Sequence, residues 1–205
     1  MKNIIIKKII KYIENKQKYS KKQLLEIEYG LTSVYLTISK IIIISLIAFY
    51  LGIIKEMLIY MLFFNIIRTT AFGLHATKSW ICLLSSTIIF IGIPILCNIL
   101  IINYYIKALI GIICILLMYK NAPADTKKRP IVNQIRRRNL KIISTIITGI
   151  YIILSLIIKN SFIDNCLIFA TILENILISP LIYKIFNMPY NNYIAFLKSH
   201  PDFNQ

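Results

Sequence analysis

Six long apolar runs constrain the fold of this chain more than any other feature. Several approach the ~20 apolar residues that an α-helix needs to cross a bilayer. None shows the period-two alternation of a transmembrane β-strand. With 58% hydrophobic residues, the sequence predicts an all-α, polytopic membrane helix bundle with about four to six membrane segments. The runs are 31–54, 57–67, 81–102, 104–119, 142–158 and 163–186.

The second run is too short for a simple span. Only 11 residues separate Glu56 from Arg68, and at ~1.5 Å per residue they fall well short of a ~30 Å hydrocarbon core. We expect this helix to borrow neighbouring residues, to thin the bilayer, or to re-enter as a half-helix that delivers residues 68–75 into a protein-lined pocket. Six full spans, or four with re-entrant elements, both remain open at this point.

The N-terminal region has the pattern of a basic amphipathic helix. Over residues 2–28, isoleucines recur at helical spacing, while most lysines fall elsewhere on the helical wheel. This pattern favours a helix lying on the inner leaflet, with its lysines against anionic lipids. A role in gripping a peptide substrate is a second interpretation. The isoleucines are Ile6, Ile9, Ile10 and Ile13.

The chain is expected to form a single integral membrane domain over 1–205. Its predicted parts are the amphipathic helix (1–30), membrane segments (31–119), a basic loop (120–141), the last membrane segments (142–186) and a tail (187–205). The prolines of the loop, Pro123 and Pro130, indicate a defined shape. In the last apolar run, Glu174 is expected to pair with a basic residue or to orient His75, and Ser179-Pro180 to kink or end the helix.

Charge placement predicts the orientation of the chain. The net charge of +16 is not accompanied by the aromatic-interleaved basic domain of a nucleic-acid-binding protein. If all six runs cross with the N-terminus inside, 21 Lys and Arg residues lie inside, and only Lys55, Lys107 and Lys159 lie outside. The positive-inside rule therefore predicts a multi-pass cell-membrane protein with both termini and residues 68–82 on the cytoplasmic side.

A polar stretch between two apolar runs carries the candidate catalytic residues, His75 and Cys82. Gly73 permits a sharp turn before the histidine. If Ser79 caps the next helix, Cys82 is its third residue, near unpaired amide donors that favour a thiolate. On one uninterrupted helix the two side chains would stand ~10.5 Å apart along the axis, so His75 is expected on a loop that folds back over Cys82.

The other cysteines have no such context. Cys97, Cys114 and Cys166 each stand alone inside an apolar run, where cysteine behaves as a small hydrophobic residue. No CxxC pair suggests a metal or redox centre, and we expect neither a metal nor another cofactor.

Two separate motifs resemble the accessory gene regulator protein B (AgrB) family, membrane cysteine peptidases of quorum-sensing peptide maturation. The first comprises Arg68, Ala71, Gly73, His75, Ala76 and Cys82, and the second is the loop 122–131, with the sequence APADTKKRPI. Many members have paired glycines before the histidine, where this chain has Phe72-Gly73. The resemblance covers nearly the whole chain and includes the acidic residue of the last helix, Glu174.

This resemblance implies a mechanism. Cys82 is the nucleophile and His75 its base, and together they cut a small AgrD-like precursor peptide through a thioester acyl-enzyme. A cysteine or serine of the peptide then displaces Cys82 and closes a thiolactone or lactone ring. The resemblance also implies a homodimer.

Several residues are expected to bind the substrate or support the site. They are Arg68, Gly73, Lys127, Lys128, Arg129, Pro130 and Glu174. The basic members are expected to hold acidic groups of the precursor or to support the oxyanion. Asp125 and Glu174 are candidates for a third catalytic residue, and a bare dyad is equally compatible with the sequence. The alternative function is a non-catalytic membrane scaffold or peptide exporter, which would tolerate loss of Cys82.

Overall fold

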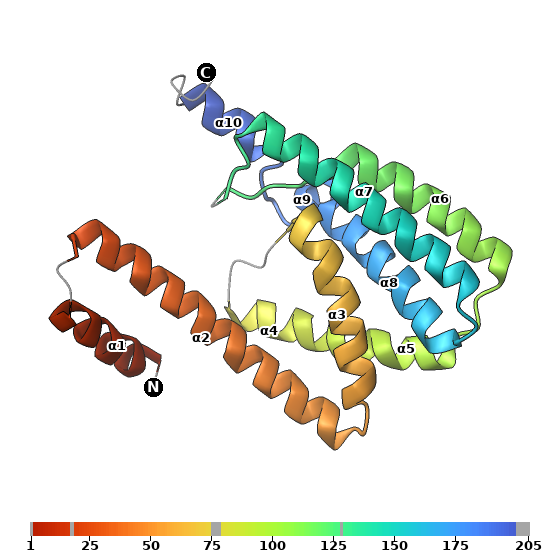
Figure 1. Cartoon of the computed structure of the whole chain (residues 1–205), viewed down its shortest axis with the longest axis horizontal. Helices are drawn as coiled ribbons and strands as arrows, with labels where there is room; N and C mark the ends of the chain where they lie inside the picture. The colour runs from red at the N-terminus through yellow and green to blue at the C-terminus, as the bar shows by residue number, and fades with distance from the viewer. Residues whose placement is uncertain (1, 17–18, 75–78, 128, 200–205) are drawn as a thin grey trace. The chain divides into compact units, whose positions relative to one another are not determined.

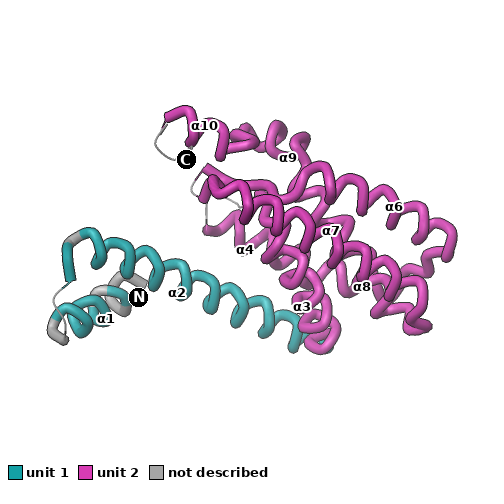
Figure 2. Tube along the Cα trace, turned by 45° about the horizontal axis from the view of Figure 1, so that its top comes forward, with its two compact units in different colours: residues 1–52 teal, residues 53–205 magenta. Residues whose placement is uncertain are grey.

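The computed structural model describes residues 2–16, 19–74, 79–127 and 129–199. These residues are helical with short connections, and no named strand occurs among them, which confirms the predicted all-α fold class (Figure 1). The chain, expected to be one domain, divides into two compact units, residues 1–52 and 53–205 (Figure 2).

The first unit consists of two helices where the sequence predicted one amphipathic helix over 2–28. Helix α1 spans Lys2–Lys16 and α2 spans Lys21–Tyr50. Ser20 begins α2 with a capping box: its hydroxyl accepts the Gln23 N–H at 3.3 Å, and its own N–H donates to Gln23 Oε1 at 2.9 Å. Because this reciprocal pair satisfies two backbone donors, it starts a new helix at residue 21. Helix α2 then continues without interruption past residue 30.

The second unit contains the remaining helices. They are α3 (Ile54–Ala71), α4 (Ser79–Thr87), α5 (Ile93–Ile99), α6 (Tyr104–Asn121), α7 (Gln134–Ile157), α8 (Ser161–Ile178), α9 (Pro180–Ile185) and α10 (Asn192–Ser199). A π-helical stretch, η1 (Ile88–Gly92), joins α4 to α5 just before Pro94. Proline has no N–H to donate, and its ring crowds the carbonyl four residues earlier, so the helix widens there without ending.

Five helical stretches within the described residues are long and apolar enough to cross a membrane: 22–50, 79–99, 104–121, 134–157 and 161–178. The short second run lies in α3, which reaches 18 residues by borrowing from both ends. Its length of ~27 Å comes close to the hydrocarbon thickness. The structure shows this run as part of one continuous helix, which is not among the five spanning candidates. The predicted break at Ser179-Pro180 is confirmed, because α8 ends there and α9 begins.

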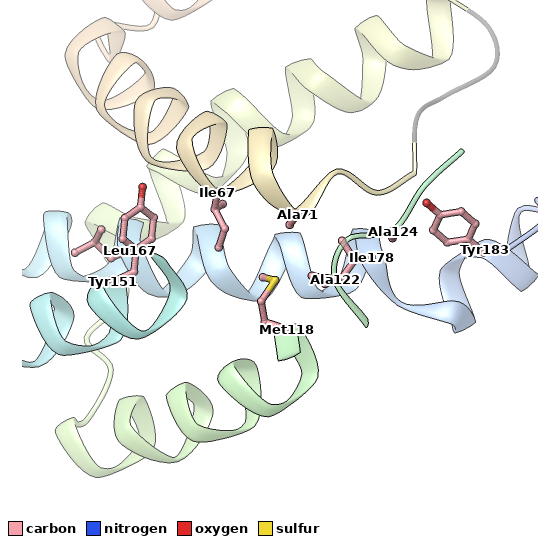
Figure 3. Packing of buried hydrophobic residues seen from close by; sticks show 9 residues of the cluster. All are labelled: Ile67, Ala71, Met118, Ala122, Ala124, Tyr151, Leu167, Ile178 and Tyr183. Carbon is pink, nitrogen blue, oxygen red and sulfur yellow. The ribbon is translucent and has the colours of Figure 1, made fainter. Parts of the chain in front are cut away.

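Helix α8 is the centre of the second unit. It contacts α3, α5, α6 and α7, and its buried residues include Leu167 and Ile178. Figure 3 shows one cluster of buried side chains gathered along α8. Because α8 is enclosed by other helices, any polar side chain on it needs a protein partner. The cluster comprises Ile67, Ala71, Met118, Ala122, Ala124, Tyr151, Leu167, Ile178 and Tyr183.

Polar contacts fix the first turn of α8 to its neighbours. Asp164 pairs with Lys107 of α6 at 2.6 Å. Next to it, the Asn165 amide donates to the carbonyls of Cys97 and Leu100 at 3.0 and 2.7 Å, where α5 ends. The pairing of Lys107 and Asp164 compensates two charges that would be costly to bury singly.

Close packing of α6 against α7 gives a stability prediction. A Cβ added to Gly111 would stand 2.4 Å from Ile152 Cγ2. Gly111→Ala should therefore force the two helices apart and lower the free energy of unfolding by about 1–3 kcal/mol. Thermal unfolding in detergent, followed by circular dichroism, measures the effect.

Gly149 of α7 is the matched control, because a Cβ there meets nothing within 4 Å among the described residues. Gly149→Ala should leave stability unchanged or raise it slightly, since alanine favours helix. Equal losses for the two variants would contradict this account of the α6–α7 contact.

Candidate active site

The candidate site is organised by an ion pair inside the bundle. Arg68, in the last turn of α3, places Nη1 at 3.3 and 3.4 Å from the two carboxylate oxygens of Glu174. Glu174 is fully buried on α8. The structure thus shows the pairing with a basic residue that the sequence predicted for Glu174. The other guanidinium nitrogen, Nη2, donates to the carbonyl of Leu74, so this ion pair holds the residue immediately before His75.

The backbone after α3 is held by hydrogen bonds to two other segments. Gly73 N–H donates to the Ala124 carbonyl at 2.7 Å, and Ala124 N–H donates to the Ala71 carbonyl at 3.0 Å. Leu74 N–H donates to the carbonyl of Leu177 in the last turn of α8, at 3.0 Å. The segment leading to His75 is therefore anchored to both the basic loop and α8.

Two consecutive residues in this segment have positive φ. Gly73 has φ of +100°, and a Cβ there would stand 2.6 Å from Arg68 Nη1 and 2.9 Å from the Leu177 carbonyl oxygen. Only glycine fits this approach without moving the ion pair or the backbone. Phe72 has φ of +63° and ψ of −121°, a conformation that strains a residue with a side chain.

Cys82 lies in α4, whose described part begins at Ser79. Cys82 is half-buried, and its carbonyl accepts the Ser85 hydroxyl at 3.2 Å. His75 and Lys128 lie outside the described residues, so the predicted approach of His75 to Cys82 stays a prediction.

Asp125 is buried and holds the basic loop to the C-terminal region. Its carboxylate accepts the N–H groups of Asn192 and Tyr193 at 3.0 and 2.8 Å, and that of Ile131 at 3.4 Å. Arg137 Nη1 lies 3.7 Å away. Asp125 therefore acts as a cap on the N-terminus of α10, supplied by a distant loop. These contacts support a structural role for the carboxylate.

The carbonyl of Asp125 accepts hydrogen bonds as well. Tyr183 Oη donates at 3.1 Å and Asn192 Nδ2 at 3.3 Å, while Tyr190 Oη donates to the Asn121 carbonyl at 3.3 Å. Burial raises the pKa of both tyrosines above its ordinary value, so they remain neutral donors at physiological pH. Hydrogen bonds to the backbone carbonyls of Asn121 and Asp125 thus hold the start of the basic loop against the C-terminal region.

The remaining predicted site residues form a turn at the surface. The Arg129 N–H donates to the Thr126 carbonyl at 2.9 Å, which closes a tight turn. Lys127 and Arg129 are exposed, and Pro130 is half-buried. The structure brings Arg68, Gly73 and Glu174 into direct contact, and connects this turn to Gly73 through Ala124. Among the described residues, no three His, Cys, Asp or Glu side chains gather as metal ligands would.

Sequence reasoning missed the partners that act through their backbone. The carbonyl of Leu177 and the N–H groups of Asn192 and Tyr193 hold the site framework. Their side chains gave no signal, because a backbone group is present at every residue.

The helices and this framework define a multi-pass, all-α membrane protein with a cysteine in a spanning helix. Comparison with known sequences gives the family: the sequence profile of accessory gene regulator B matches residues 6–178, and the chain belongs to that family. The segment after Ile178, including α9 and α10, lies beyond the matched region.

Relatives of known sequence agree with this assignment. A putative AgrB-like protein of Clostridium acetobutylicum is 33% identical over 174 residues, covering 85% of this chain and 83% of the relative. One of Listeria monocytogenes is 31% identical, covering 82% and 83%. An accessory gene regulator protein B of Staphylococcus epidermidis is 29% identical, covering 87% and 91%. No solved structure gives a significant match.

The crowding at Gly73 gives a prediction. Gly73→Ala places a methyl group against Arg68 and the Leu177 carbonyl, so it should lower the free energy of unfolding by about 1–3 kcal/mol more than strain at φ alone does. Thermal unfolding in detergent again provides the measurement.

Gly52→Ala is the control, because Gly52 also has positive φ, +72°, but open space around it among the described residues. The two variants share backbone strain and differ in crowding. A Gly73→Ala variant no less stable than Gly52→Ala would show that the approach of Arg68 to Gly73 is unimportant.

Proposed function

We propose that this protein is a membrane-embedded cysteine endopeptidase that matures a small AgrD-like pheromone precursor in quorum sensing. The observation that carries the proposal is the hydrogen bond from Arg68, which is paired with Glu174, to the Leu74 carbonyl. An ion pair inside the bundle is costly to bury. Here it fixes the backbone directly before the only histidine between the apolar runs, in a chain of the accessory gene regulator B family.

The first half of the reaction forms an acyl-enzyme. His75 takes the proton of the Cys82 thiol, and the thiolate attacks the carbonyl carbon of the scissile peptide bond. When the tetrahedral intermediate collapses, the C–N bond breaks and His75 gives the proton to the departing amine. The upstream part of the precursor is left as a thioester on Cys82, and the downstream part leaves as a free amine.

The second half closes a ring. A thiol or hydroxyl within the bound peptide attacks the thioester carbonyl, and Cys82 leaves as a thiolate that recovers a proton. Exchange of one thioester for another is nearly isoenergetic, so the protein's contribution is to hold the peptide's nucleophile close and to exclude water. A site at the edge of the membrane suits both needs.

The structure supports different roles for the basic residues. Arg68 is engaged by Glu174 and Leu74, which favours positioning of the catalytic loop over direct contact with the precursor. Lys127 and Arg129 are exposed on the turn beside Ala124 and Asp125 and offer a surface for acidic groups of the precursor. By their place in the sequence, Lys128 and Pro130 are proposed to bind the precursor as well.

The membrane arrangement completes the proposal. Charge placement puts both termini and the site on the cytoplasmic side, with α1 on anionic lipids of the inner leaflet. The protein acts without a cofactor, as a homodimer.

Substitution of the nucleophile tests the function. Cys82→Ser and Cys82→Ala should each reduce cleavage of a co-reconstituted precursor at least about a thousandfold, because neither side chain supplies a thiolate. Mass spectrometry of the cleaved fragments gives the rate, and a thioester-linked peptide on the wild-type protein gives the intermediate.

Ser86→Ala, on the same helix α4, is the control and should cleave at the wild-type rate. Processing that survives Cys82→Ala would exclude the peptidase and favour a scaffold or exporter.

A further inference from the structure

A groove runs along the second unit between α6, α8 and α9, with a cavity volume of about 450 Å³. This volume falls within the range of small-molecule sites, about 300–1,000 Å³. On α6 it is lined by Ile110, Ile113, Cys114 and Leu117. On the other side its lining includes Asn175 of α8, Ser179 between α8 and α9, and Ile182 of α9. Because α6 and α8 are both membrane-spanning candidates, the groove lies at membrane depth.

The polarity of the groove changes along its length. Helices α6 and α8 each have 18 residues and pair through their first turns at Lys107 and Asp164, so they run in the same direction and end at the same level. The beginning of the groove, at Ile110 and Ile113, is apolar. Asn175 and Ser179 lie toward its far end, where α8 finishes.

Two lysines stand at that same end. Ile110, Ile113 and Leu117 form a stripe at helical spacing, and Lys120 continues the stripe one turn further, in the last turn of α6. Lys184 lies in α9, two residues after Ile182. Both lysines are exposed. The lining of the groove is almost wholly apolar, and the two lysines stand beyond its far end, outside the lining. An apolar groove with two cations past one end complements an amphiphile with an apolar tail and an anionic head.

Near the polar end of the groove, Asn175 provides a buried hydrogen-bond acceptor that has no partner in the described part of the chain. Its Nδ2 donates to the Thr171 carbonyl at 2.9 Å, while Oδ1 is buried without a hydrogen-bond partner among the described residues. An unpaired buried acceptor is costly in an apolar setting, and a ligand with a hydroxyl donor at this depth would satisfy it.

We propose that the groove binds one anionic phospholipid of the inner leaflet. An acyl chain lies along Ile110, Ile113 and Leu117, and the phosphate contacts Lys120 and Lys184. Asn175 accepts a hydrogen bond from the headgroup side. A polyol headgroup, as in phosphatidylglycerol, offers both the negative charge and the hydroxyl donors.

The position of the groove distinguishes this ligand from the precursor peptide. Asn175 is rotated by about 100° around α8 from Glu174. The groove thus opens on a different face of the helix from the one that holds the segment before His75. The lipid site is therefore independent of the proposed peptidase function.

Native mass spectrometry of the full chain in detergent, titrated with phosphatidylglycerol or phosphatidylcholine, tests the proposal. The wild type should bind phosphatidylglycerol about tenfold more tightly than phosphatidylcholine, which corresponds to about 1.4 kcal/mol. Equal affinity for the two lipids would overturn the proposal.

Two pairs of variants locate the site. Ile113→Trp fills the groove and should abolish the preference for phosphatidylglycerol, whereas Ile112→Trp, on an exposed neighbour that does not line the groove, should keep it. Lys120→Gln with Lys184→Gln should lower phosphatidylglycerol affinity about tenfold and leave phosphatidylcholine unchanged. Lys159→Gln, beyond the opposite end of the bundle, should change neither.

The lysine variants lie on exposed positions, so they test the site even if the tryptophan variant fails to fold. Unchanged phosphatidylglycerol affinity in the double lysine variant would overturn the proposal. Displacement of the bound lipid by a synthetic precursor peptide would overturn it as well, because the groove would then be a peptide site.

Discussion

The Arg68 guanidinium is the contact on which the rest of the site depends. It bridges a buried carboxylate on α8 and a backbone carbonyl beyond the end of α3. Removal of one partner from a buried ion pair leaves the other charge uncompensated. Separation of the end of α3 from α8 would therefore be costly, and the ion pair holds the two helices together there. Because Gly73 has no side chain, Arg68 can pass close to its backbone. This close approach lets Gly73 N–H donate to the Ala124 carbonyl and Leu74 N–H donate to the Leu177 carbonyl.

A second constraint comes from the membrane, where every polar group on the central helix α8 needs a partner inside the protein. In the first turns of α8, Asp164 pairs with Lys107, and the Asn165 amide nitrogen donates to two carbonyls at the end of α5. Toward its C-terminal end, Glu174 pairs with Arg68, and the Leu177 carbonyl accepts the Leu74 N–H. The proposed site and the proposed lipid groove use different faces of this same helix.

Apolar runs predicted most of the fold because the length and polarity of a spanning helix follow from the bilayer itself. The local signal at Pro180 was also reliable, because α8 ends at Ile178 and α9 begins at Pro180. The break between α1 and α2 was missed, although the pair Ser20 and Gln23 is a readable capping box. For the site, charge in an apolar run predicted that Glu174 would be paired. The hydrogen bonds from the backbone N–H groups of α10 to Asp125 could not be predicted. Their donors, Asn192 and Tyr193, lie 67 and 68 positions after Asp125, and a backbone N–H gives no signal in the sequence.

The most direct test of the account is the alkylation rate of Cys82 as a function of pH, in reconstituted protein whose other three cysteines are replaced by alanine. The account predicts rapid labelling that persists at about pH 6.5, well below the ordinary thiol pKa of about 8.5. His75→Ala should abolish this low-pH labelling, and Glu174→Gln should weaken it by loosening the hold on the Leu74 carbonyl. An ordinary thiol profile, unchanged by either substitution, would contradict the claim that this framework presents a preformed catalytic pair.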